Sequence, residues 1–294
     1  MANEVGNTEL SATKQEIITE IAQRALVSAS VLMPTFRDYS NRAVKGASQV
    51  SIPKWSSLFS VENRATATAG TNQNLAFDKD TMSLDQRAHI QWVIDSDDEI
   101  ESTLDVQREY IQHASEEHAA DFDRNGIVLM EAAGIPITPT GDIDQDKVLL
   151  MQRILLKNKA RMNQMFLAVS PKQHAALLKI DPFVSADKYG GAARPLVDGA
   201  LGSIYGMQVI MTPELGDDQY FAYTSEGMAY ALQRAPAYDE SPKPEFGVGA
   251  KLQVLAQKYG QKACQVEVPG AFQEDGTTAL AAGQSAFIVK DGNV

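Results

Sequence analysis

Alternation of apolar and polar residues is clearest from Thr81 to Ile94 and predicts one long half-buried strand. Successive side chains of a strand point to opposite faces, so a period of two marks one buried face. The apolar positions that would form this face are Met82, Leu84, Ala88, Ile90, Trp92 and Ile94. Polar residues occupy the alternate positions, which predicts that the other face lies toward solvent.

A helical period follows this strand and predicts a long helix that ends near Ala133, before Gly134 and Pro136. Ser96 and Glu99 form a capping-box pattern at its start, where acidic groups also favour the helix dipole. The predicted apolar face consists of Ile100, Leu104, Ile111, Ala114, Phe122, Val128 and Leu129. At about 1.5 Å per residue, a helix of roughly 30 residues spans about 45 Å.

The N-terminal region predicts a loose polar tail over residues 1–10 and then an amphipathic helix from Ser11 to Leu32. The residues on its apolar face are Ile17, Ile21, Ala25, Ala29 and Leu32. Pro34 stops the run. Such a helix at the edge of the chain could pack on its own core or on that of a neighbour, and the pattern leaves both open.

The second half of the chain alternates short strands with helices. Ile143 to Arg161 has a helical period, with Val148, Leu149, Ile154 and Leu155 predicted to face inward. Ser170 followed by Pro171 is a strong helix start signal. The short apolar runs predicted as strands are Met165–Val169, Met207–Met211, Tyr220–Tyr223 and Ala286–Val289.

Two long strands are predicted after Tyr238, with a turn at Lys258-Tyr259-Gly260 between them. The apolar positions that would pair across this turn are Leu252, Val254 and Ala256 with Cys264, Val266 and Val268. A glycine between two alternating runs is a common signal for a turn. Cys264 lies within this pattern, which predicts a buried structural thiol.

The segment 46–78 has a different composition. Val50 to Trp55 predicts a short strand, which Pro53 restricts to a sheet edge. Residues 60–76 are small and polar, and so long a connection in a compact domain is usually functional or disordered. Trp55, Phe59 and Phe77 flank this stretch. Bulky apolar residues around a segment with little core of its own predict burial against another molecule.

Composition excludes several classes of protein. The chain has 294 residues, of which 44% are hydrophobic, so it can bury a substantial core. No apolar run approaches the roughly 20 residues of a membrane helix, and the polar N-terminus has no signal-peptide core. The net charge of −12 argues against a groove that tracks nucleic acid. It fits a container that repels enclosed DNA, and equally an ordinary acidic surface.

Candidate chemistry is weak throughout the sequence. His113 and His118 are five residues apart, which places them on different helix faces, unlike zinc-binding histidines four apart. Gly190 and Gly191 lack the following Lys-Ser or Lys-Thr of a phosphate loop. The acids from Asp95 to Glu99 lack the alternation of a calcium loop. Ser225 has no elbow motif. We therefore expect no catalytic residue, metal or cofactor, and hence no enzyme.

The stretch from Leu196 to Phe272 carries a resemblance. LGSIYG leads into the strand MQVIM and the turn TPEL, then FAYTSEG, and then long alternating runs around KYG. With the preceding strand and long helix, this order resembles the tailed-bacteriophage major capsid protein, which has the Hong Kong 97-type fold. The resemblance implies an α+β fold. The implied parts are an N-terminal arm and helix at 1–45, an extended loop at 46–78, a peripheral domain with a spine helix at 79–135 and 239–275, an axial domain at 136–238, and a C-terminal tail at 276–294.

The resemblance also implies a function. Copies of the chain would form pentamers and hexamers of an icosahedral shell that encloses phage double-stranded DNA without reading its sequence. The shell would be part of the virion, assembled in the host cytoplasm without membrane association. Separate scaffolding, portal and decoration proteins would be its partners. The implied inter-subunit contacts are Lys54, Trp55, Phe59, Arg64 and Phe77 in the extended loop, and Tyr189 and Arg194 in an axial loop.

Two alternatives remain open at this point. An encapsulin-type compartment would keep the fold and enclose cargo enzymes, but the polar loop at 60–76 and the missing cargo-groove signature favour the phage shell. An acidic cytosolic hydrolase or isomerase with an unrecognised site would belong to a different class. Shell proteins form large symmetric particles, whereas such an enzyme would form a small oligomer.

Overall fold

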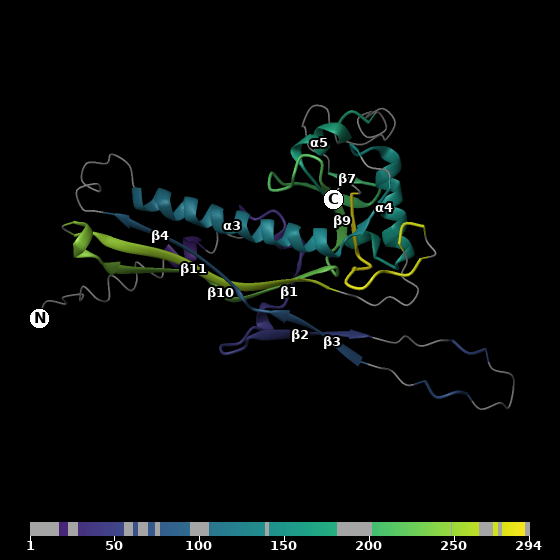
Figure 1. Cartoon of the computed structure of the whole chain (residues 1–294), viewed down its shortest axis with the longest axis horizontal. Helices are drawn as coiled ribbons and strands as arrows, with labels where there is room; N and C mark the ends of the chain where they lie inside the picture. Colours follow the sequence, from purple (N-terminus) through teal and green to yellow (C-terminus); the bar gives the residue numbers. More distant parts are fainter. Residues whose placement is uncertain are drawn as a thin grey trace, which may run out of the picture.

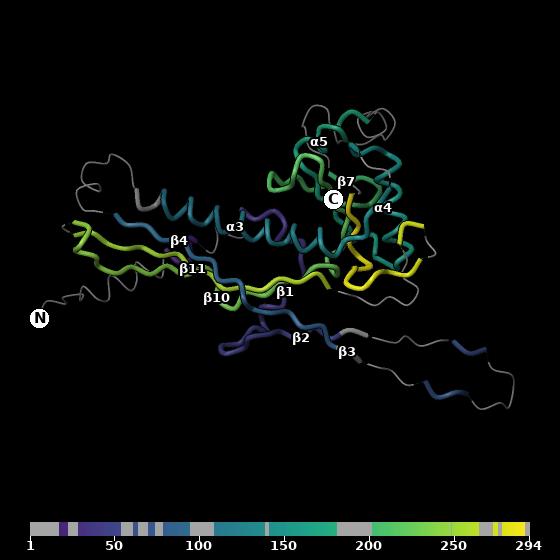
Figure 2. Tube along the Cα trace, in the orientation of Figure 1, coloured from purple at the N-terminus to yellow at the C-terminus, as the bar shows by residue number. Residues whose placement is uncertain are grey.

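The computed structural model has a compact lobe at one end, a long sheet with a helix along it, and a two-stranded ribbon that projects from their junction (Figure 1). The residues that it describes are 18–22, 29–55, 61–63, 70–73, 77–94, 106–138, 141–180, 202–247, 249–264, 273–275 and 278–291. The Cα trace shows the same three parts, with the ribbon directed away from both the lobe and the long sheet (Figure 2).

The long sheet has four strands in the order β1-β10-β11-β4. Their bounds are β1 (Arg37–Asp38), β10 (Met228–Pro242), β11 (Lys251–Ala263) and β4 (Gln86–Ile94). β10 and β11 form an antiparallel hairpin whose register runs from Met228↔Ala263 to Pro242↔Lys251. The predicted strand from Thr81 to Ile94 is in fact two strands. β3 (Phe77–Ser83) ends before Leu84, and β4 begins at Gln86.

The turn predicted at Gly260 is wrong, because β11 runs straight through this residue. The hairpin instead turns after Pro242, where the short helix η4 (Pro244–Phe246) lies. Gly260 has a different role. A Cβ at this position would collide with the backbone carbonyl oxygen of Ser83, so only glycine lets the end of β3 cross β11 this closely.

Helix α3 (Val106–Ala133) lies along one face of the long sheet (Figure 1). Its predicted end at Ala133 is confirmed, and its predicted start at Ser96 lies outside the described residues. Ile111, Ala114 and Phe122 are buried as expected, but Val128 is 61% exposed. Val128 is six residues beyond Phe122, about 240° around the helix, so Ile127 and Met130 are buried in its place.

The lobe is built on a six-stranded sheet in the order β5-β12-β9-β6-β8-β7. The bounds are β5 (Ile135–Pro136), β12 (Ile288–Lys290), β9 (Tyr220–Thr224), β6 (Met165–Val169), β8 (Met207–Met211) and β7 (Ser203–Ile204). All five residues of β9 are buried. The predicted strands at Met165, Met207, Tyr220 and Ala286 are therefore confirmed, the last with its start shifted to Ile288.

Two helices pack on this sheet, α4 (Gln145–Lys157) and α5 (Pro171–Leu177). Ser170 caps α5 as predicted, since its Oγ accepts a hydrogen bond from the backbone of Gln173. Val148, Ile154 and Leu155 of α4 are buried as expected. Leu149 is 37% exposed, so its predicted inward position is wrong.

The N-terminal segment packs on its own chain. Ile18 and Ala22 lie in one apolar cluster with Ile111 and Leu255. Ile21 is 47% exposed, which corrects the predicted apolar face by one residue. The α-helix ends at Ala29, three residues before the predicted end at Leu32, and Pro34 lies inside the 3-10 helix η1 (Met33–Thr35) that follows. Two further 3-10 helices are η2 (Ser40–Arg42) and η3 (Met162–Gln164).

The structure moves three of the expected domain boundaries. Residues 228–238 belong to β10 of the long sheet, although we expected an axial domain up to residue 238. β12, within the expected C-terminal tail, is an interior strand of the lobe. β3 extends the ribbon of the expected loop at 46–78 to Ser83. In each case the boundary is set by pairing with a strand that is distant along the chain, and such pairing leaves no local signal in the sequence.

Candidate assembly surfaces

The ribbon that projects from the molecule consists of β2 (Gln49–Trp55) and β3, and we call it the arm. The two strands are antiparallel, with a register from Gln49↔Ser83 to Trp55↔Phe77. This confirms the strand predicted at Val50 to Trp55. An isolated two-stranded ribbon is marginally stable in water. The arm therefore depends on how its base is attached.

Apolar packing holds the base of the arm. Val50, Ile52, Met82 and Leu84 are buried in one cluster with residues of the long sheet and of the N-terminal segment. The other members of this cluster are Tyr39, Ala43, Ala229, Ala231 and Cys264. Burying four large side chains at about 1.5–3 kcal/mol each offsets the ordering of two short strands.

Polar contacts add to this attachment. Lys262 of β11 forms an ion pair with Asp80 and donates to the backbone oxygen of Thr81 at 2.7 Å. The Nε2 of Gln233 donates to the backbone oxygen of Ala47 at 2.7 Å. These contacts bind both sides of the arm base to the β10–β11 hairpin. No local sequence pattern predicts these contacts, because all the partners are distant along the chain.

Cys264 lies beside this attachment and is buried, as predicted. Burial and the nearby carboxylate of Asp80 raise the pKa of its thiol to about 12. The thiol is therefore protonated at neutral pH, and this form is a poor nucleophile. The structure supports a packing role for Cys264.

The predicted contact residues lie mostly beyond the described part of the chain. The backbones of Lys54, Trp55 and Phe77 form the outer end of the arm, with Trp55 and Phe77 as register partners. Their side chains, and the predicted contact residues Phe59, Arg64, Tyr189 and Arg194, lie outside what the structure describes. Their role in assembly stays a prediction.

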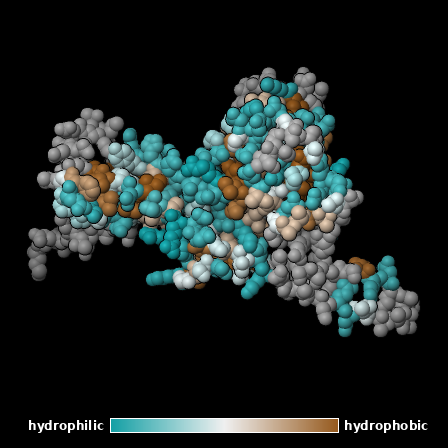
Figure 3. Space-filling view, viewed as in Figure 1, coloured by the Kyte–Doolittle hydropathy of each residue, from teal (hydrophilic) through white to brown (hydrophobic). Residues whose placement is uncertain are grey.

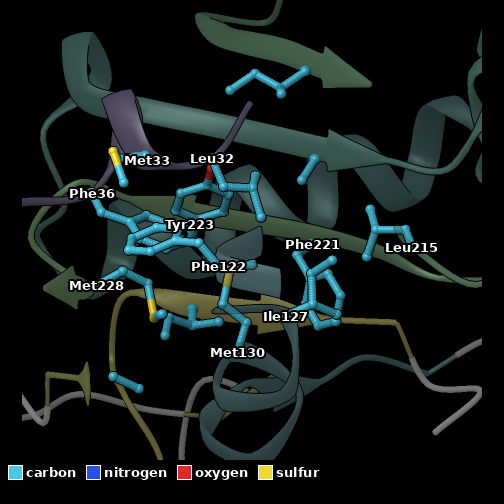
Figure 4. Close-up of a cluster of buried hydrophobic side chains, with 14 of the residues drawn as sticks. Leu32, Met33, Phe36, Phe122, Ile127, Met130, Leu215, Phe221, Tyr223 and Met228 are labelled. Atoms are coloured by element: carbon cyan, nitrogen blue, oxygen red, sulfur yellow. The ribbon is translucent and has the colours of Figure 1, made fainter. Parts of the chain in front are cut away.

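A group of aromatic side chains joins the lobe to the long sheet (Figure 4). The ring of Phe122 lies 5.2 Å from that of Tyr259 and 5.5 Å from that of Tyr230, measured between centroids. Phe36 contacts both Phe122 and Tyr223, the latter a residue of β9 in the lobe. One continuous core thus fixes the two parts as a unit.

Asp123 of α3 holds the N-terminal segment against this core. Its carboxylate accepts hydrogen bonds from the Oγ of Ser30 at 2.6 Å and from the backbones of Val31 at 2.9 Å and Leu32 at 3.3 Å. Burial raises the pKa of Asp123, and the three hydrogen bonds oppose that rise. The sequence has an Asp on each side of Phe122, and no local pattern shows that Asp123 is the one that is buried.

A polar seam runs between α3 and β11. His118 is buried, and its Nε2 lies 3.1 Å from the backbone oxygen of Leu255. The Oε1 of Gln253 accepts from the indole of Trp92 at 2.7 Å. Gln257 and Gln261 donate to backbone oxygens of α3 at 3.4 and 2.9 Å. Burial lowers the pKa of His118, which keeps the ring neutral.

The two histidines of α3 do not come together. His113 is exposed and lies near Glu116, whereas His118 faces β11. Within the described ranges, no three potential ligands among His, Cys, Asp and Glu converge on a metal-sized site. None of the helices in those ranges is both long and apolar enough to cross a membrane.

The surface is largely hydrophilic, with separate apolar patches over the far end of the long sheet and on the lobe (Figure 3). Val93, Tyr110 and Phe246 are exposed apolar residues on β4, α3 and η4. They surround the end of the long sheet that lies away from the lobe. The elements most remote from the core therefore present apolar surface to the outside.

Comparison with known proteins decides the family. A family model described as phage capsid protein matches residues 72–267, more than half of the chain. The chain belongs to the phage capsid protein family. Its members are structural proteins, so the α+β fold and the capsid assignment predicted above are confirmed.

Solved structures agree with the fold of this capsid protein. A structure titled Mycobacterium phage Che8 has a TM-score of 0.70 at 17% identity, covering 89% of this chain and 90% of that one. The capsid of cyanophage P-SCSP1u has a TM-score of 0.64 at 11% identity, covering 87% and 86%. A virus-like particle from Pyrococcus furiosus reaches 0.59 at 11% identity, covering 94% and 98%. Among curated proteins, no sequence relative was found.

Proposed function

We propose that this capsid protein is the major subunit of an icosahedral shell, built from pentamers and hexamers, that encloses phage double-stranded DNA. The observation that carries the proposal is the arm, which is attached firmly at its base and directed away from its own lobe and long sheet (Figure 1). A two-stranded ribbon is marginally stable alone and gains stability when it lies on another subunit. The whole-chain likeness to phage capsid structures supports the same conclusion.

The fold is suited to a shell subunit. The aromatic core around Phe122 joins lobe and long sheet into one rigid plate, so that contacts at one edge fix the position of the other. Each contact between subunits need only be weak, because a closed shell repeats it many times. The net charge of −12 repels enclosed DNA and disfavours tight binding to it.

Several expectations belong to this proposal. Assembly would take place in the host cytoplasm, and the finished shell would be part of the virion. Scaffolding, portal and decoration proteins would be separate chains. We expect no catalytic activity and no required cofactor, since the work of the chain is to hold its neighbours.

The test uses Trp55→Ala and Phe59→Ala. Interface aromatics often contribute about 2 kcal/mol or more, and repetition in a shell amplifies each loss. We expect both variants to fold normally as dissociated subunits, by circular dichroism and thermal melting, but to close shells poorly, by sedimentation. Val128→Ala, which truncates an exposed residue of α3, is the control. If the variants assemble normally, these residues do not form the contact between subunits. If the variants unfold, these residues belong to the core of their own subunit.

A compartment that encloses protein cargo is the second candidate, and the likeness to the Pyrococcus virus-like particle favours it. The phage capsid family model favours the first candidate. Particles purified from infected cells distinguish the two. Nuclease-protected DNA inside the shell supports the phage capsid, and co-purifying protein cargo without DNA supports the compartment.

A further inference from the structure

An open cavity of about 530 Å³ lies where the base of the arm meets the β10–β11 hairpin. The residues that line it are Lys45, Gly46, Ala47, Ser48, Gln233, Arg234 and Lys258. Three of these residues are cationic and none is acidic. The turn that carries Lys45 is held in place, since the Nε2 of Gln233 donates to the backbone oxygens of Val44 at 3.0 Å and Ala47 at 2.7 Å.

Strand register extends this group of cations. Arg234 of β10 pairs with Lys258 of β11, and Lys258 pairs with Arg87 of β4. Neighbouring strands lie about 5 Å apart, and directly opposite residues share one face of the sheet. Three positive charges therefore stand side by side across three strands. We call Arg87, Lys258 and Arg234, together with Lys45, the cation row.

The cation row lacks compensating charge. In the part of the chain that the structure describes, none of its four members takes part in an ion pair. Other cations of the same hairpin do so, because Lys251 lies 3.6 Å from Glu240 and Lys262 pairs with Asp80. Like charges opposite one another destabilise a sheet. An anion held among these side chains would remove that penalty.

We propose that the cation row binds carboxylates from a second copy of this chain. This inference rests on the proposed shell function. The chain carries 38 acidic residues against 26 basic ones, so a neighbouring copy approaches with a mainly acidic surface. A compact cationic cavity is a place where two such copies can meet without repulsion. Phosphates of DNA fit less well, because a net charge of −12 repels a polyanion before it reaches four cations.

Two parts of the chain could supply these carboxylates. The run DSDDEIE at residues 95–101 has the densest negative charge and directly follows β4. The cation row lies seven residues back along β4, about 23 Å from the end of that strand. The second source is Glu62, in the connection between the two strands of the arm, whose pKa is lowered by a hydrogen bond from the backbone of Thr71.

The experiment begins with the double variant Arg234→Glu/Lys258→Glu. The control is Arg161→Glu/Lys179→Glu, which makes the same change in net charge at exposed lobe residues that also lack an ion pair within the described ranges. Under conditions where the unmodified chain closes shells, we expect at least ten-fold fewer shells from the first variant and normal yield from the control. Circular dichroism and melting of dissociated subunits should show that both variants fold.

A charge swap then identifies the source. Asp97→Lys/Asp98→Lys/Glu99→Lys, combined with the reversed cation row, should restore closure if the acidic run is the partner. Glu62→Lys in the same background should restore it if the arm is the partner. The proposal is overturned if neither swap restores closure, or if the reversed row assembles like the control. If the variant with the reversed cation row forms shells normally but retains less DNA, the row binds DNA phosphates rather than carboxylates. If the unmodified chain and the control close shells, the proposed shell function holds whichever of these outcomes is observed. If neither closes shells, it is the shell function that fails.

Discussion

The lobe and the long sheet bury their secondary structure in different ways. In the lobe, strands β6 and β9 are covered on both faces by apolar clusters, while buried polar side chains such as Gln173 and Asn158 donate to backbone oxygens of connecting segments. In the long sheet, α3 covers one face through a seam that includes His118, Gln253 and Gln257. Its other face carries the cation row and is covered in part by the base of the arm, which packs against Ala229 and Ala231. The strands of the lobe are therefore covered mainly by apolar side chains, whereas the contact between α3 and β11 combines apolar side chains with buried polar ones.

This difference suits a shell subunit. The strands of the lobe are enclosed, whereas the face of the long sheet around the cation row keeps surface available for neighbouring copies. The polar seam also fixes the register of α3 on β11, since a shift by one residue would leave buried amides without partners.

Leu167→Ala should give the largest loss of stability, because Leu167 is fully buried in β6 between β8 and β9. Truncation of such a leucine costs about 2–5 kcal/mol in transfer and cavity terms. Urea unfolding of the dissociated subunit measures this cost. Leu149→Ala on the partly exposed side of α4 is the matched control and should cost far less. Equal losses would contradict the view that the lobe core dominates stability.

Gly260→Ala tests the joint between the arm and the long sheet. The added methyl group would meet the backbone of Ser83, which cannot rotate away as a side chain can. We expect a loss of about 1–3 kcal/mol from overpacking, and faster proteolysis at the base of the arm. Gly202→Ala is the control, because nothing lies within 4 Å of a Cβ added there. Unchanged proteolysis of Gly260→Ala would show that the crossing adjusts without releasing the arm.

Two buried glutamines of the seam should respond differently to the same change. Gln253→Leu leaves the indole of Trp92 without its acceptor, which costs about 1–3 kcal/mol. Gln257→Leu removes a weak 3.4 Å contact and an oxygen that has no hydrogen-bond partner among the described residues. We expect that variant to be neutral or slightly more stable. Thermal melting of both subunits compares them, and equal losses would mean that both amides are satisfied.

Acidification should weaken the seam through His118. Burial holds the pKa of this imidazole below its usual 6.5, although the carbonyl of Leu255 and the charge of Asp121 oppose the shift and His89 adds to it. Below pH about 6.5 the unfolded chain therefore binds the proton first, and stability falls as the pH falls. His118→Gln should flatten this part of the melting profile, while His113→Gln, at an exposed site, should not. If the melting temperature depends on pH in the same way for the unmodified chain and both variants, His118 does not cause the pH dependence.

Local sequence patterns predict most elements of the fold but not how distant elements meet. Ser170-Pro171, the end of α3 and the arm strand at Val50 follow local rules that the structure obeys. The local pattern at Gly260 predicts a turn, because the residue that requires a glycine there, Ser83, lies far away along the chain. Gln253 and Gln257 occupy the buried phase of β11, so polarity alone predicted the wrong face. The cation row depends on register across three strands, which no local pattern contains.

The place of β12 has a consequence for how the subunit is made. This strand comes late in the chain yet lies between β5 and β9, in the interior of the lobe sheet. Until the ribosome has released it, β5 and β9 have unpaired edges and the lobe cannot close. A chain that stops before Ile288 therefore lacks an interior strand of the lobe sheet. Synthesis of β12 thus acts as a checkpoint, which keeps chains without it out of a structure that one defective copy could interrupt.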